Sequence, residues 1–156
     1  AASDVYKRQP DFTEYGRTVF ADLDITFDLI AALYRVMHDF DTFRELAMLY
    51  FASAIYCETT RRLGRPSAAH GFLLRDHPTF GPGLRDCLRR VGRNSGPVVR
   101  EAIRSLIEPF NLGGLCRPEK LHWYGCEASE LYASADRIGA NRQEITEMLR
   151  RTGFAG

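Results

Sequence analysis

The side chains with the most metal-like spacing in this sequence lie near its end, at Cys116, His122 and Cys126. Thiolates and imidazoles are the ligands that zinc takes in structural sites, but such a site needs four of them converging on one point. This cluster offers three at an unusual spacing, and nothing in the sequence requires His77 or Cys87 to supply a fourth. We therefore interpret the three as unrelated residues of a packed loop and expect no metal site.

Acidic pairs are the next candidates, because two facing carboxylates can act as general acid and base. Asp22 and Asp24, like Asp39 and Asp41, are two residues apart, and on a helix this spacing turns the side chains in different directions. The sequence also lacks a dinucleotide fingerprint, a phosphate-binding P-loop and a nucleophile elbow. Residue types and spacing alone therefore predict no catalytic set.

Two tyrosines lie in the stretch from Leu46 to Cys57, which reads LAMLYFASAIYC and holds no charge. A buried tyrosine hydroxyl takes a hydrogen-bond partner, which for Tyr50 and Tyr56 is a bound ligand or, more commonly, a backbone carbonyl. A helix without a polar face must be enclosed by other elements. The stretch is shorter than the roughly 17 residues that cross a bilayer, so we predict the central helix of a bundle.

The bulk composition is that of a globular domain, and 156 residues suffice for one core. The net charge of +1 gives no field that would attract nucleic acid or an anionic membrane, so we expect neither partner. The 19 arginines against 2 lysines suit carboxylate or phosphate binding, but a genome-wide codon bias explains the same ratio.

The four cysteines show no C-x-x-C pair, which favours reduced thiols in a cytoplasmic protein over a disulfide framework. We find no signal peptide and no transmembrane segment. Residues 1–9, AASDVYKRQ, carry no periodicity and are typical of a non-native leader. We therefore expect a single helical domain over residues 10–156, with upstream sequence missing.

Helical periodicity surrounds the central stretch on both sides. From Phe12 to His38, large apolar residues recur at alternating steps of three and four, which predicts the seam that the first helix presents to its neighbours. This seam consists of Phe20, Leu23, Phe27, Ile30, Tyr34 and Met37.

Further helices are predicted with their start and stop signals. The second runs from Thr42 to Leu63, capped by Asp41 or Thr42, and the short joint before it makes the first two helices antiparallel neighbours. The others begin between Thr79 and Pro82, at Pro97, at Ala128 (as one helix to Ile138) and after Asn141, ending at Arg151.

An aromatic-rich loop precedes the last two helices. It runs from Pro109 to Glu127 and reads PFNLGGLCRPEKLHWYGCE. A loop so rich in Phe, Leu, Trp and Tyr packs on the bundle or covers something. The fold expected is thus an all-α bundle of about five or six helices with this loop near its C-terminus.

Three segments of the chain read LAMLYFASAIYCETTRRLG, GFLLRDHPTFGPGLRDCL and IEPFNLGGLCRPEKLHWY. In their residue content and in their order along the chain, they resemble the C-terminal region of FAD-dependent oxidoreductases of the flavin-dependent halogenase type, over residues 11–126. In that family a large N-terminal part holds the flavin, and a smaller helical part packs against it and walls the substrate side.

The resemblance implies part of a flavin enzyme that is not catalytic by itself. The family's dinucleotide fingerprint and its halogenation lysine belong to the N-terminal part and have no counterpart here. Lys7 lies in the suspected leader, and Lys120 lies in a different context. Halogenation, monooxygenation and dehydrogenation therefore stay open, as does the substrate.

The resemblance also implies residues that face the substrate or the flavin-binding part. Tyr50 and Tyr56 of the central helix would reach a substrate cavity, and Trp123 and Tyr124 would stack on a small aromatic substrate. Packing within the core or an interface is the alternative for each of them.

Three residues of the PFNLGG segment, Asn111, Gly113 and Gly114, would lie along the route toward the missing flavin-binding domain. The glycine pair is only a weak phosphate signal, since a turn is its commoner meaning. FAD is expected in the complete enzyme, and the isolated chain is expected not to retain it.

Two functions from different classes follow. The first is the substrate-side C-terminal portion of an FAD-dependent, halogenase-like oxidoreductase. The alternative is a stand-alone helical module whose apolar loop docks a protein partner. A severed portion should expose an apolar patch well above the few hundred Å² usual for a monomer, whereas an independent module should cover that surface or match it by self-association.

Overall fold

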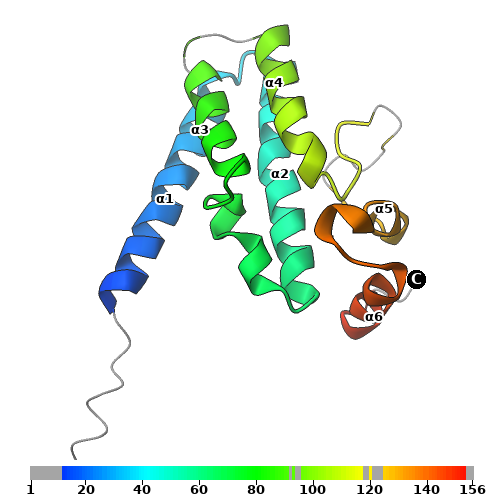
Figure 1. Cartoon of the computed structure of the whole chain (residues 1–156). Helices are drawn as coiled ribbons and strands as arrows, with labels where there is room; N and C mark the ends of the chain where they lie inside the picture. The colour runs from blue at the N-terminus through cyan, green and yellow to red at the C-terminus, as the bar shows by residue number, and fades with distance from the viewer. Residues whose placement is uncertain (1–11, 92, 94–95, 118–119, 121–124, 154–156) are drawn as a thin grey trace, which may run out of the picture.

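The computed structural model describes residues 12–91, 93, 96–117, 120 and 125–153 of the chain. These residues form six α-helices and no strand, which confirms the predicted all-α bundle (Figure 1). The helices are α1 (Phe12–Arg35), α2 (Phe40–Arg62), α3 (Phe80–Val91), α4 (Pro97–Ile107), α5 (Ala128–Ala133) and α6 (Arg142–Arg151). Short 3₁₀ helices occupy Pro66–Ala69, Phe72–Leu74, Glu108–Phe110 and Ala135–Ile138.

The central position of α2 follows from its sequence and is confirmed. Leu46, Met48, Leu49 and Ala52 are buried, because α4, α1 and the 3₁₀ turns that follow α2 surround the helix. Helices α1 to α4 run in alternating directions, and α1 with α2, the two longest, form the expected antiparallel pair (Figure 1). The joints after α1 and after α3 are short, which favours antiparallel neighbours, whereas residues 63–79 with their two 3₁₀ turns connect α2 to α3.

The predicted orientation of the first helix is wrong. Its stripe of large apolar residues faces outward, and the opposite side packs on the bundle through Ile25, Leu29, Ala32 and Val36. These four recur at steps of four, three and four, so they form a second helical stripe of their own. These side chains are smaller than the aromatic ones on the other side, so they let α1 approach its neighbours closely. The aromatic side of α1 therefore faces outward.

Most helix ends match their sequence signals. Gly96 precedes Pro97 at the start of α4, and Asn141 with Glu144 forms both hydrogen bonds of a capping box on α6. The predicted cap of α2 is wrong. Asp39 caps the helix instead, because its carboxylate accepts from the backbone N–H and the hydroxyl of Thr42.

The chain after residue 127 builds a second, smaller core against α2. Leu112, Leu131, Ile145, Met148 and Leu149 form it. The single helix expected from Ala128 to Ile138 is broken into α5 and a 3₁₀ turn. The break occurs at Ser134, whose hydroxyl donates to the carbonyl oxygens of Leu112 and Glu130.

Candidate functional site

The most unusual feature of the surface is the outward side of α1. Phe20, Phe27 and Tyr34 are 69%, 65% and 70% exposed, although each is a large aromatic residue. The exposed apolar residues of α1 and its two ends are Phe12, Tyr15, Phe20, Leu23, Phe27, Ile30, Tyr34, Met37 and Phe40. We call the run from Phe20 to Met37 the α1 stripe.

The apolar surface of α1 and its two ends is too large for an ordinary monomer. Taking about 150–250 Å² per large apolar side chain, the nine exposed residues together expose on the order of 1,000 Å². The largest patch on a typical monomer is about 300–600 Å². The steps of three and four also place these side chains in one row, as on helices that pack side by side. The stripe therefore has the size and geometry of an interface.

An apolar hollow of about 270 Å³ adjoins the stripe between α1 and α2. Ile30 and Leu33 line it from α1, Tyr50 and Phe51 from α2, and Phe72 from the 3₁₀ turn. Tyr50 is 42% exposed, so the expectation that it is enclosed in the helix core is wrong. Its position on the outer side of α2 instead extends the apolar surface of α1.

Phe72 reaches this hollow from a strained backbone. His70, Leu73 and Leu74 have φ angles of 46°, 52° and 56°, in a region that non-glycine residues rarely adopt. Such residues cost about 1–3 kcal/mol each and persist where the surroundings hold them. Here the side chains of Leu73 and Leu74 are buried, while the side chain of Phe72 stays partly exposed.

Arg75 fixes this strained segment onto α1. Its guanidinium forms an ion pair with Asp22 and donates to the carbonyl oxygen of Thr18 at 3.1 Å. It also pairs with Asp76 at 2.8 Å, whose backbone N–H donates to the carbonyl oxygen of His70. These contacts of Arg75 therefore hold the segment in place beside the hollow. Sequence reasoning missed Phe72 and Arg75, because no local pattern marks either.

A buried carboxylate, that of Glu45, lies near the N-terminal end of α2. The side chain of Glu45 is 2% exposed and receives hydrogen bonds from Arg104 at 2.6 Å, Arg44 at 3.4 Å and the Cys116 thiol at 3.3 Å. Burial raises the pKa of Glu45, but the hydrogen bonds from Arg104 and Cys116 outweigh it and hold this pKa below its ordinary value. The carboxylate is thus charged and fully partnered, which suits a structural role.

Tyr56 lies between the two hydrophobic clusters of the chain. Its ring packs edge-on against Phe110, with centroids 5.4 Å apart, and burial raises the pKa of its hydroxyl. It lies apart from the hollow that Tyr50 lines. The structure therefore does not bring the two tyrosines together at one cavity.

Asn111, Gly113 and Gly114 form a compact turn. The Asn111 amide accepts from the Leu115 N–H at 2.7 Å and donates to the Leu115 carbonyl oxygen at 2.9 Å. A Cβ on Gly113 would meet Cys126 and Ile55 at 3.2 Å, so this glycine permits close packing.

Gly114, the last of the three, has a φ angle of +56°, which a glycine adopts without strain. Nearby, Lys120 pairs with Glu130 at 2.7 Å and donates to the Gly113 carbonyl oxygen. The turn is therefore closed by its own contacts within the chain.

Three residues named from the sequence, Trp123, Tyr124 and His122, lie outside the described residues. Among the residues that the structure does describe, no group of three or more His, Cys, Asp or Glu side chains is placed to hold a metal ion. Helices long and apolar enough to cross a membrane are also missing from this described part.

Comparisons with family models, with curated proteins and with solved structures returned no match to this chain.

Proposed function

We propose that this chain is the substrate-side C-terminal portion of an FAD-dependent, halogenase-like oxidoreductase, and that the α1 stripe packs against the flavin-binding part. The resemblance of three segments supplies the family. The α1 stripe is the structural observation that carries the proposal, because a helix with two apolar sides has one side without a partner in the described chain.

In this proposal the chain shapes a pocket and leaves the chemistry to the FAD-binding part. Bound FAD would supply the redox chemistry. The apolar hollow beside the stripe, lined by Tyr50 and Phe72, would form part of the substrate wall and keep water out. A small aromatic substrate suits such a wall, because apolar and aromatic side chains surround it. The free thiols fit a cytoplasmic location.

The second candidate, a stand-alone interaction module, rests on the same exposed stripe. It differs in what covers that stripe, since a separate protein or a second copy would take the place of a covalently linked flavin-binding part. The aromatic-rich loop was the docking element expected for this module, but its Trp123 and Tyr124 lie outside the described residues. The stripe is therefore the surface on which both candidates are compared.

The deciding experiment is to read the source DNA upstream of residue 10 and express both the extended and the short chain. We expect an open frame that encodes a strand, a glycine-rich loop and a helix, and an extended protein that retains FAD at about one per chain. The short chain should purify colourless.

Hydroxyl-radical footprinting then tests the stripe. Phe27 and Tyr34 should be protected in the extended protein and labelled in the short one, while the buried Leu29 serves as the internal control. A genuine start codon near residue 10, or a short chain that itself purifies yellow with bound FAD, would rule out the proposal. Equal labelling of the stripe in both proteins would show that the flavin-binding part does not cover it.

A further inference from the structure

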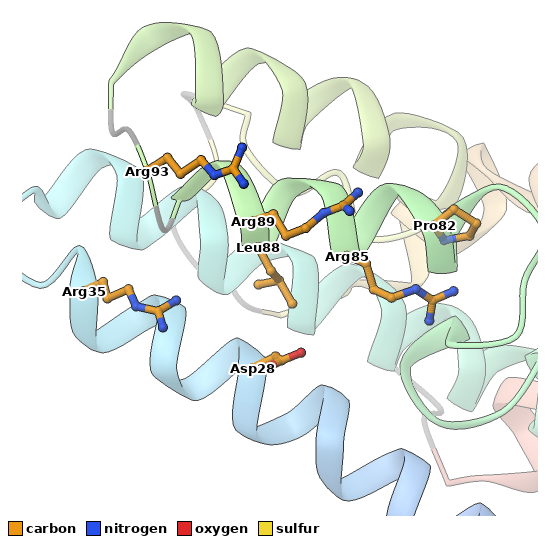
Figure 2. A pocket seen from close by; sticks show the side chains of 7 residues that line it. All are labelled: Asp28, Arg35, Pro82, Arg85, Leu88, Arg89 and Arg93. Atoms are coloured by element: carbon orange, nitrogen blue, oxygen red, sulfur yellow. The ribbon is translucent and has the colours of Figure 1, made fainter.

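A second surface feature lies on the other flank of α1, where a groove of about 590 Å³ runs between α1 and α3. Arg85, Arg89 and Arg93 line it from α3 and the segment that follows. Figure 2 shows these three side chains in a row along the groove, with Arg35 and Asp28 on α1 across from them. The volume is within the range of about 300–1,000 Å³ typical of small-molecule sites.

The groove has an excess of positive charge that the described chain does not neutralise. Asp28 is the one acidic side chain among the described residues that line it. On α3, Asp86 pairs with Arg90 at 2.6 Å and with Arg89 at 3.4 Å, so one carboxylate is shared by two cations. Arg35 and Arg93 form no ion pair with any described residue.

Helix dipoles explain only part of this arrangement. Arg35 and Arg89 lie in the last turns of α1 and α3, where the negative end of the helix favours a cation. Arg85 lies in the middle of α3, and like charges four residues apart on a helix repel each other. An anion bound in the groove would turn this repulsion into attraction.

We propose that the groove between α1 and α3 binds a small molecule that carries a phosphate or pyrophosphate group. Guanidinium groups offer paired N–H donors that match two oxygens of a phosphate. Arginines on both walls can contact opposite sides of one such group. Leu88 and Pro82, which also line the groove, supply an apolar surface for the rest of the molecule. This inference goes beyond the proposed function and stands independently of it.

The test is isothermal titration of the whole chain with inorganic pyrophosphate at low salt. We expect saturable binding at one site. Arg89→Ala on α3 and Arg35→Ala on α1 should each weaken it about five- to tenfold, the effect of one charge-assisted hydrogen bond at an exposed site. Asp28→Asn should strengthen binding, because it removes the one opposing charge of the groove.

Two further variants separate a site from general attraction to arginine. Arg89→Lys keeps the charge but loses the paired donors, so it should bind more weakly than the wild type. Arg150→Ala removes an exposed arginine of α6, outside the groove, and should bind as the wild type does. Unsaturable binding, or equal losses for Arg150→Ala and Arg89→Ala, would overturn the proposal. Tighter binding to a single-stranded oligonucleotide than to pyrophosphate would overturn it too.

Discussion

Glu45 of α2 and Arg104 of α4 are 59 residues apart in the chain and meet at a distance of 2.6 Å between Oε1 and Nη2. The carboxylate is buried and the guanidinium is half exposed. The ion pair therefore joins the central helix α2 to α4 at the edge of the core. Cys116 completes the cluster from the loop after α4. One carboxylate thus holds three separate parts of the fold together.

The first prediction concerns this pair. Arg104→Ala should lower the free energy of unfolding by about 1–3 kcal/mol, because a buried carboxylate loses its shortest charged partner. Urea denaturation followed by circular dichroism measures the change. Arg150→Ala, which breaks an exposed pair with Glu147, is the matched control and should change stability by less than about 0.5 kcal/mol. Equal effects of the two variants would contradict the structural role of Glu45.

The second prediction concerns the stability of the fold at acidic pH. The pKa of Glu45 is lower in the folded chain than its ordinary value of 4.5, so unfolding takes up a proton there. The resulting stabilisation is complete above pH 4.5 and is lost as the pH falls through the lower folded pKa. Denaturation midpoints between pH 7 and pH 3 should therefore fall, and fall less steeply in Glu45→Gln. Parallel curves for both proteins would show that Glu45 does not contribute.

The third prediction separates the two sides of α1. Tyr34→Glu changes an exposed residue of the α1 stripe and should leave the stability of the isolated chain within about 0.5 kcal/mol of the wild type. Leu29→Ala on the buried side should cost about 2–5 kcal/mol. Tyr34→Glu should also reduce binding of a hydrophobic dye, since it interrupts the apolar patch. A destabilising Tyr34→Glu would show that the stripe is buried within the isolated chain.

The fourth prediction concerns the thiols. Burial first, and the Glu45 carboxylate next, raise the pKa of Cys116 to about 12, and burial raises the pKa of Cys87 to about 11. A thiol with such a pKa holds almost no thiolate at pH 8, so it reacts slowly with a disulfide reagent. Cys87, which is buried, and Cys116, which is exposed, should both react slowly in the native chain and rapidly in urea. Fast labelling of Cys116 in the native protein would contradict the Glu45 contact.

Sequence patterns predicted the helices better than their orientation. The uncharged run in α2 and the capping box of α6 each have one structural meaning, and both were confirmed. The first helix carries two apolar stripes, and the sequence offers no local reason to bury the one with Ile25 and Leu29 instead of the one with Phe27. That choice depends on how closely neighbouring helices can approach, which is a tertiary property.

The candidate site could be predicted only in part. Tyr50 was singled out for its place in an apolar helix and does line the hollow, although it is more exposed than expected. Phe72 and the Glu45–Arg104 pair depend on segments far apart in the sequence. No spacing rule connects them, because their contacts are set by the backbone between α2 and α3 and by the packing of α4 on α2.

The division of the interior into two clusters has a kinetic consequence. Residues Ile55 and Tyr56 of α2 touch both clusters, while Leu131, Ile145 and Met148 belong to the smaller one alone. Arg65 connects the two sides through hydrogen bonds to Ile138 and Glu144, and Arg137 connects them through hydrogen bonds to Glu108 and Asn111. Because the smaller cluster has its own apolar interior, we expect α5 and α6 to open as one unit while α2 and α4 stay folded, so that their amide hydrogens exchange with solvent first.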